Sequence, residues 1–188
     1  NGEQDEIYFK LMPTMGINGM VGFPICGIAL KKNTPFMKNV YYANTTNDKQ
    51  KMDIYIPKNA DGTYKAGPFP AVITIHGGNW FEGDKDDYDY MMPFITNPSN
   101  DSNLPGCNCV HVNMNYRLLN CIRKENNMPI FSNEPTEGYA FTYTDMLYDI
   151  GEAIAYLQSH ADIYHVDASK IALMGYSACG HLVLLYAY

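Results

Sequence analysis

The sequence predicts an α/β fold, in which helices cover a mostly parallel sheet and form three layers with it. Strands are predicted at 71–75, 109–113 and 170–174, and the first of them is a short β-branched run, which is typical of a strand buried on both faces of a parallel sheet. Helical patterns lie between these runs, and strands that alternate with helices are typical of α/β proteins. With 188 residues, 46% of them hydrophobic, the chain is large enough for one core.

The individual elements follow from local patterns. Residues 40–43 and 52–56 are predicted as strands, and the second alternates apolar and polar side chains until a proline ends it. A turn is predicted over 59–70, which contains Asp-Gly and Gly-Pro pairs. A weak helix is predicted over 86–95 and a strong one over 145–160. The strong helix has an apolar stripe formed by Met146, Ile150, Ala153, Ile154 and Leu157.

The N-terminal region has no clean hydrophobic periodicity. We expect an extension of unclear structure over residues 1–38 and the N-terminal part of an α/β domain over residues 39–188. No charged residue occurs from Leu11 to Leu30, but two prolines and four glycines interrupt this stretch, so we expect an apolar loop and no membrane span. The chain begins at Asn1 without an initiator methionine, as it would after removal of a signal peptide or after trimming, and a secreted or cell-envelope location is favoured over the cytoplasm.

Charge and cysteine content restrict the possible partners. The net charge of −7, with no basic stripe, excludes a nucleic acid and favours a neutral small molecule. Five irregularly spaced cysteines imply no disulfide framework, although a single bridge stays open. Cys107, Cys109 and His111 alternate along a predicted strand and are conceivable metal ligands, but an interior strand is the favoured interpretation. We expect no metal and no organic cofactor, and the oligomeric state stays open.

Ser177 is the candidate nucleophile. It lies three residues after a buried strand and directly before an apolar helix, as a nucleophile elbow requires, because the serine must occupy a tight turn with small neighbours. The pattern Gly-x-Ser-x-Gly has Cys179 in place of its second glycine, and cysteine is still small enough to pass the neighbouring strand. An ordinary loop serine is the alternative interpretation.

A second motif, His76-Gly77-Gly78-Asn79-Trp80, directly follows the strand that ends at Ile75. Backbone N–H groups of small residues at such a position can turn toward a reacting carbonyl oxygen and form an oxyanion hole. A glycine-rich turn without chemistry is the alternative. Because both motifs follow parallel strands, we expect them to converge on the crevice where such sheets bind ligands.

In combination these motifs resemble the α/β-hydrolase esterases and lipases that carry a His-Gly-Gly-x-Trp oxyanion loop, including the hormone-sensitive-lipase-like and the feruloyl- or acetyl-esterase-like branches. The resemblance covers the chain from about Tyr55 to Tyr188 and implies a three-layer α/β-hydrolase fold. The matching segments occur in the expected order: Asp53 to Pro57, Pro68 to Pro70, His76 to Trp80, Gly83 to Lys85, Asn115 to Leu118, Asp149 with Ala153, Tyr156 and Leu157, and Ser177 to Leu182.

The resemblance implies that Ser177 is the nucleophile and that the backbone N–H groups of Gly78, Asn79 and Ala178 bind the oxyanion. Asn79 replaces a glycine or alanine of many relatives, but the donor is a backbone group and is retained. Cys179 lies in the first turn of a packed helix, so a nucleophilic role of its own is not expected.

Four further residues are expected to support this site without taking part in the chemistry. The resemblance implies that His76 and Trp80 hold the oxyanion loop. Arg117 and Asp149 are predicted to form a buried ion pair between the Asn-Tyr-Arg turn and the following helix. His181, one helical turn after Ser177, is also expected to be structural.

The implied activity is hydrolysis of a small-molecule carboxylic ester through an acyl-enzyme. A peptidase, an arylformamidase-type amide hydrolase and a non-catalytic binding protein of the same fold stay open. In this fold the triad order is Ser, then Asp or Glu, then His, and only eleven residues follow Ser177. We therefore expect the fold to be truncated after the nucleophile-elbow helix, with the triad acid and histidine beyond residue 188. The 188 residues alone are expected to have no meaningful turnover.

Residues 119–144 form a longer connection than the turn after Leu118 requires. This stretch is rich in Asn, Pro, Glu and aromatic residues. We expect it to overhang the pocket as part of the acyl or alcohol site, with a plain surface excursion as the alternative.

Overall fold

The computed structural model divides the chain into two compact units, residues 1–34 and residues 35–188. In the first unit, β1 (Ile7–Tyr8) pairs antiparallel with β2 (Leu30–Lys31). The predicted apolar loop begins at Leu11, and its residues 11–29 lie outside the described residues. The predicted domain boundary between residues 38 and 39 stays a prediction. The structure describes the following residues: 7–8, 30–31, 36–91, 95–96, 107–126, 128–132 and 140–188.

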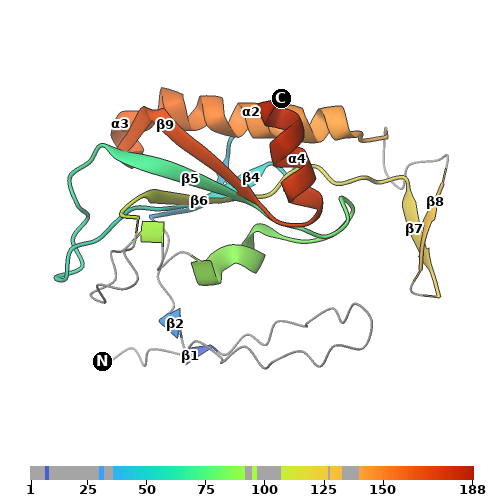
Figure 1. Ribbon diagram of the computed structural model, residues 1–188, viewed down its shortest axis with the longest axis horizontal. Coiled ribbons are helices and arrows are strands. Elements are labelled where there is room, and N and C mark those ends of the chain that lie inside the picture. The colour runs from blue at the N-terminus through green and yellow to red at the C-terminus, as the bar shows by residue number, and fades with distance from the viewer. Residues whose placement is uncertain are drawn as a thin grey trace. The chain divides into compact units, whose positions relative to one another are not determined.

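The second unit contains a five-stranded sheet with the order β3-β4-β6-β5-β9 (Figure 1). β5, β6 and β9 are parallel to one another, whereas β4 is antiparallel to both of its neighbours. The predicted α/β fold with a mostly parallel sheet is confirmed. The strands are β3 (Met37–Tyr41), β4 (Lys51–Tyr55), β5 (Phe69–Ile75), β6 (Val110–Met114) and β9 (Val166–Gly175).

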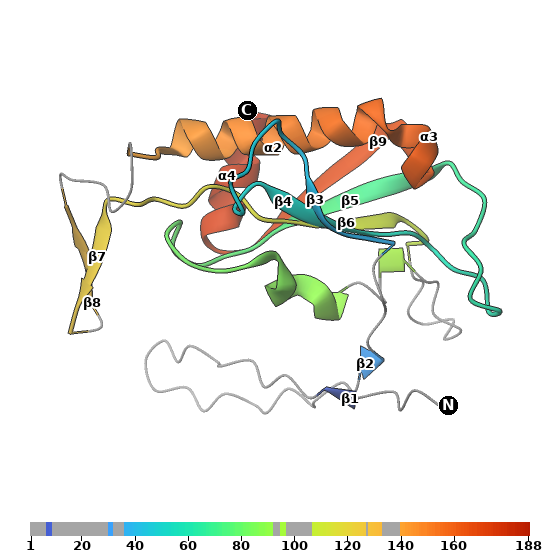
Figure 2. The same ribbon diagram turned by 180° about the vertical axis from the view of Figure 1, so that it is seen from behind.

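Helices cover both faces of this sheet. The helices α2 (Tyr143–Ser159) and α4 (Ala178–Ala187) pack on one face, next to β9, and η1 (Lys85–Met91) lies on the opposite face (Figures 1 and 2). A short helix, α3 (Ala161–Tyr164), links α2 to β9. Three layers are therefore present, as predicted.

The two faces of the sheet differ in polarity because side chains alternate along each strand. Ile73 of β5 and Val112 of β6 are register partners and are fully buried in the apolar core, which also includes Met146 and Ile150 of α2. The next residue along β5, Thr74, points to the other face and hydrogen-bonds to His111 of β6 at 2.9 Å. Burial of each large apolar side chain stabilises the fold by about 1.5–3 kcal/mol.

Helix α2 begins at Tyr143, two residues before the predicted start. Thr142 is its N-cap, and the Thr142 backbone N–H donates to Asp145 Oδ2 at 2.8 Å, which is one half of a capping box. The weak helix predicted over 86–95 is instead the 3₁₀ helix η1, and its described residues end at Met91. Residues 92–94, within the predicted range, lie outside the described residues.

A hairpin that was not predicted from the sequence, β7 (Ile122–Glu125) with β8 (Met128–Phe131), lies within the long connection. Glu125 pairs with Met128, so two residues form the turn, and Asn126 has a left-handed φ of 52°. Asparagine tolerates this conformation better than most residues, and it favours tight hairpin turns. The hairpin extends away from the sheet in both views (Figures 1 and 2).

The sheet brings three strand ends together. Ile75 at the end of β5 is the register partner of Met114 at the end of β6 and of Gly175 at the end of β9. The segments that follow these three strands therefore leave the sheet at the same edge. Within the described ranges, no helix is both long and apolar enough to span a membrane.

Candidate active site

Ser177 occupies a sharp turn between β9 and α4. Its backbone has φ 60° and ψ −124°, a region that non-glycine residues adopt only where the surrounding structure enforces it. A Cβ atom at Gly175 would lie 2.6 Å from the carbonyl carbon and oxygen of Cys179, so the turn requires glycine there. The Ser177 side chain is exposed, and its hydroxyl makes no hydrogen bond to any residue that the structure describes.

The glycine-rich loop after β5 lies directly beside this turn. A Cβ atom at Gly77 would lie 3.3 Å from the Tyr176 carbonyl oxygen and 3.8 Å from Ser177 Cβ. Gly78, Asn79 and Trp80 all have positive φ angles, of 118°, 51° and 66°. This run of left-handed conformations turns the chain back sharply, and it brings the two motifs that the sequence singled out into contact.

The imidazole of His76 fixes the orientation of the Gly77–Gly78 peptide. His76 Nδ1 lies 2.8 Å from the Gly77 carbonyl oxygen, and because a carbonyl only accepts, Nδ1 carries the proton. In a trans peptide the C=O and N–H groups point in opposite directions. The Gly78 N–H is therefore held pointing away from His76.

The peptides that carry the other two predicted oxyanion donors are also fixed. The Gly78 carbonyl accepts hydrogen bonds from the backbone N–H groups of Phe81 and Glu82 at 3.1 and 3.0 Å, which orients the N–H of Asn79. The Ser177 carbonyl accepts from the His181 N–H at 3.3 Å, which orients the N–H of Ala178. Ala178 is the first residue of α4, and such N–H groups have no acceptor within their own helix.

His76 itself is fully buried and stacks on Tyr116, with ring centroids 4.6 Å apart. Burial lowers the pKa of His76 below its ordinary value, so the ring is neutral at neutral pH. No hydrogen bond links it to Ser177. The contacts of His76 are those of a group that holds the loop.

An aromatic cluster joins the loop to two helices. Trp80 lies edge-to-face against His181 of α4, with ring centroids 5.5 Å apart, and against Tyr143 of α2 at 5.7 Å. Tyr143 and His181 also contact each other at 5.8 Å. Such ring pairs contribute about 0.5–1.5 kcal/mol beyond burial, so this cluster stabilises the position of the loop against α4.

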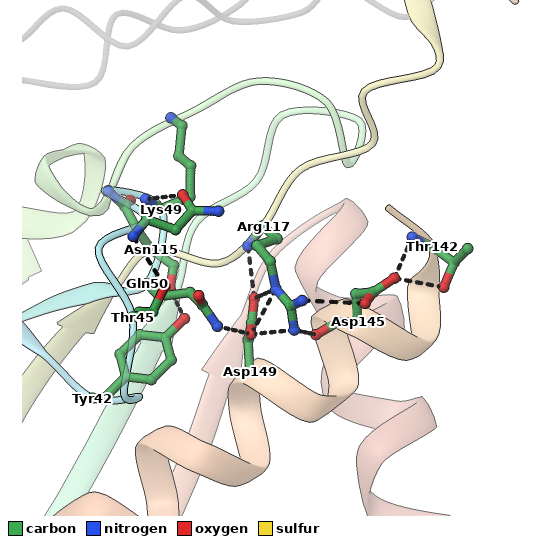
Figure 3. A network of polar contacts seen from close by, with 10 residues as sticks. Tyr42, Thr45, Lys49, Gln50, Asn115, Arg117, Thr142, Asp145 and Asp149 are labelled. Atoms are coloured by element: carbon green, nitrogen blue, oxygen red, sulfur yellow. Dashed lines mark hydrogen bonds and ion pairs between the residues drawn. The ribbon is translucent and has the colours of Figure 1, made fainter. Parts of the chain in front are cut away.

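The predicted ion pair between Arg117 and Asp149 is present (Figure 3). Arg117 Nη2 and Nε lie 2.7 and 3.0 Å from Asp149 Oδ1, and the Arg117 backbone N–H donates to Oδ2 at 2.8 Å. Arg117 Nη1 also reaches Asp145 at 3.2 Å, and Gln50 donates to Asp149 at 2.8 Å. These bonds tie the turn after β6 to the first half of α2.

A second buried ion pair, between Lys85 and Asp53, had no predicted role. Lys85 Nζ lies 3.0 Å from Asp53 Oδ2, and the two side chains are only 6% and 1% exposed. The Lys85 backbone N–H donates to Asn115 Oδ1 at 2.6 Å, and Asn115 Nδ2 donates to Asp84 at 3.1 Å. This network holds the chain where the oxyanion loop ends. Asp53, the one charged residue of the strand predicted over 52–56, was the available signal.

The other three histidines are engaged elsewhere. His111 Nε2 bonds to Thr74, His160 Nδ1 to the Tyr156 carbonyl at 2.9 Å, and His165 Nδ1 to the Lys65 carbonyl at 2.8 Å. His165 directly precedes β9, at the end of that strand opposite to Ser177. No described histidine is hydrogen-bonded to the Ser177 hydroxyl.

The alternative metal site at Cys107, Cys109 and His111 does not form. The Cys109 thiol donates to the Cys107 carbonyl at 3.3 Å, and His111 stacks on Tyr55 with ring centroids 5.7 Å apart. In the part of the chain that the structure describes, no group of three His, Cys, Asp or Glu side chains is placed to hold a metal ion.

The chain matches a known protein family. The family model described as BD-FAE matches residues 52–131 and 136–188, which is more than half of the chain and contains both the loop and the turn. The chain belongs to the BD-FAE family. This is an esterase-like family of α/β-hydrolases, so the resemblance that the motifs indicated is confirmed. No curated protein sequence matches the chain at a significant level.

Solved structures share the fold of this BD-FAE chain. Esterase B from Lactobacillus rhamnosis is 22% identical, with 80% of this chain and 38% of that one covered and a TM-score of 0.55. A bifunctional GH43-CE protein of Bacteroides eggerthii is 22% identical, with 79% and 17% covered and a TM-score of 0.54. Esterase 2 of Thermogutta terrifontis is 23% identical, with 78% and 44% covered and a TM-score of 0.51. The chain spans less than half the length of each.

A cavity of about 280 Å³ lies at the base of the hairpin in this BD-FAE chain. Six of its lining residues come from the connection between β6 and α2, and Phe81 directly follows the loop after β5. The lining does not include Ser177 or the three predicted oxyanion donors. Its lining residues are Asn47, Lys49, Phe81, Arg117, Leu118, Leu119, Asn120, Ile122 and Phe141.

Proposed function

We propose that the protein hydrolyses carboxylic esters through an acyl-enzyme on Ser177. The observation that carries this proposal is the contact between the strained turn at Ser177 and the loop at Gly77, where the peptides of the neighbouring N–H groups are fixed by hydrogen bonds. An exposed hydroxyl beside preorganised N–H donors is the arrangement that acyl transfer requires.

In the first half of the reaction, Ser177 Oγ bonds to the ester carbonyl carbon and its proton passes to a general base. The carbonyl electron pair moves to the oxygen, and the N–H groups of Gly78, Asn79 and Ala178 bind the oxyanion. One such donor typically contributes about 10²–10³-fold to the rate. The intermediate then expels the alcohol, which takes the proton from the base, and water repeats the sequence to release the acid.

The general base is proposed to come from outside the 188 residues. All five histidines are described, and none of them is hydrogen-bonded to Ser177. The chain also spans less than half the length of the similar esterase structures. We therefore propose that the triad histidine and acid lie beyond residue 188 and that the 188 residues alone have no meaningful turnover.

The proposed substrates are esters of short acyl groups with small alcohols or sugars. A structure of Lactobacillus esterase B holds a tributyrin phosphonate inhibitor, and one of Thermogutta esterase 2 holds butyrate. Another similar structure is a truncated carbohydrate esterase from gut microbiota. The proposed reaction requires no metal or organic cofactor.

An activity panel on the natural full-length protein tests this function. We expect hydrolysis of nitrophenyl acetate and butyrate, and loss of about 10³-fold or more in kcat for Ser177→Ala, because the nucleophile is removed. Peptide and formamide substrates serve as the comparison. Faster turnover of either would identify an amide hydrolase, and no Ser177-dependent turnover of any substrate would identify a binding protein.

A further inference from the structure

The backbone carbonyl of His76 accepts hydrogen bonds from two side chains of different elements. The Tyr116 hydroxyl, from the turn after β6, donates to it at 3.2 Å, and the Cys179 thiol, from the first turn of α4, donates to the same oxygen. The hydroxyl and the thiol also contact each other at 3.4 Å. All three side chains have no exposed surface.

This carbonyl lies where β5 passes into the oxyanion loop. The His76 ring stacks on Tyr116 and donates to the Gly77 carbonyl, so a shift of His76 would turn the peptide that carries the Gly78 N–H. Tyr116 thus contacts His76 through both its ring and its hydroxyl. Cys179 is two residues from Ser177, so it connects the loop to the turn that carries the nucleophile.

We propose that Tyr116 and Cys179 are positioning residues of the oxyanion hole, which hold its loop against the nucleophile turn through the His76 carbonyl. The inference rests on the proposed function. The Gly-x-Ser-x-Gly pattern has glycine at the position of Cys179, and glycine has no side-chain donor. The cysteine therefore adds a bond between loop and turn that the pattern itself does not contain.

The protonation state of the thiol fits this role. Burial raises the pKa of Cys179 to about 11, so it stays protonated and able to donate at neutral pH. Burial likewise raises the pKa of the Tyr116 hydroxyl. A carbonyl oxygen has two lone pairs and can accept from both groups at once.

Kinetics on the full-length protein test the proposal with Tyr116→Phe, Cys179→Ala and their combination. Each single variant should lower kcat by about three- to tenfold with KM nearly unchanged, because misplaced donors affect the transition state. The double variant should lose more than the product of the two, since only then does the buried carbonyl lose its last donor. Cys179→Ser, which restores a donor, should recover most of the kcat lost in Cys179→Ala.

A transition-state analogue separates positioning from mere packing. A trifluoromethyl ketone forms a tetrahedral adduct with the serine, so its affinity should fall by the same factor as kcat/KM in each variant. The matched control is Cys109→Ala, which removes another buried thiol at the opposite end of the sheet, before β6. It should lower thermal stability while it leaves kcat and analogue affinity unchanged.

The inference is overturned if the double variant keeps kcat and analogue affinity within twofold of the parent. If the double variant does not fold, the two single variants decide the question in the same way, because each keeps one donor. Failure of the proposed function is a separate outcome, in which the parent protein itself has no Ser177-dependent activity.

Discussion

At the scale of single residues, two glycines permit the tight turn at Ser177 and its contact with the loop at Gly77. Gly77 faces the Tyr176 carbonyl and Ser177, and Gly175 faces the main chain of Cys179. A side chain at Gly77 would push the loop away from Ser177, and one at Gly175 would force the turn itself open. Gly180 of helix α4 differs from these two glycines. A Cβ atom there would lie 3.5 Å from the Gly175 carbonyl oxygen, which is an ordinary van der Waals contact.

These glycines give a paired prediction. Gly175→Ala should destabilise the protein by about 1–3 kcal/mol, because the added Cβ would lie 2.6 Å from backbone atoms, and it should abolish labelling of Ser177 by a phosphonate. Gly180→Ala, within helix α4, should leave stability unchanged or raise it by about 0.5–1 kcal/mol. Thermal unfolding and labelling measure both effects. Equal behaviour of the two variants would show that the turn has more room than the structure indicates.

Buried His111 predicts a pH dependence of stability. Burial lowers its pKa to about 3, whereas an unfolded chain has a histidine pKa near 6.5. Between these values the unfolded state binds more protons, so the free energy of unfolding decreases as the pH falls below about 6.5, by at most about 1.4 kcal/mol per pH unit.

Chemical unfolding between pH 4.5 and 7 measures this effect. The His111→Gln variant should show a shallower pH dependence than the parent protein, because it removes the group whose pKa changes most in that range. Some slope should remain, since burial also lowers the pKa of His76. Identical slopes for parent and variant would contradict the assignment to His111.

At the scale of elements, periodicity alone predicted the central strands and the long helix. Ile73, Val112 and Ile150 lie in regular apolar patterns, and the patterns persist because the sheet and α2 bury them together. The β7–β8 hairpin was missed because each of its strands has only four residues, which is too short for a clear alternating pattern. The hairpin forms through antiparallel pairing of β7 with β8 across a tight turn.

The polar part of the site was less predictable than the glycines and the serine. The Lys85–Asp53 pair lies far apart in sequence, and charged residues are usually expected at the surface. Contacts of Trp80 with Tyr143 and His181 likewise depend on three separate elements. Patterns within one segment do not report such contacts, because they arise only when the tertiary structure forms.

The long connection between β6 and α2 carries the next prediction. It lines the cavity through Leu119, Asn120, Ile122 and Phe141, so we expect it to contribute to the acyl or alcohol site. Replacing residues 126–134 with a short Gly-Ser linker should change the ratio of kcat/KM for acetate and butyrate esters. The thermal stability of the variant should remain close to that of the parent. An unchanged ratio in a folded variant would favour a plain surface excursion.

At the scale of the whole chain, the topology accounts for the site. Parallel strands β5, β6 and β9 end at the same edge, so segments centred on residues 78, 116 and 177 meet there although they are far apart in the sequence. One loop provides candidate N–H donors, the second provides Tyr116 and Arg117, and the third provides the serine. Hydrogen bonds hold each segment to its neighbours, and the third is held through the Cys179 thiol, which donates to the His76 carbonyl.

The most direct test of the account is covalent labelling of the folded full-length protein with a fluorophosphonate, followed by peptide mapping in a mass spectrometer. We expect a single adduct on Ser177, formed at the same rate as esterase activity is lost. No adduct should form in Ser177→Ala or after denaturation. An adduct on another residue, equal labelling of the Ser177→Ala variant, or complete loss of activity with Ser177 unmodified would contradict it.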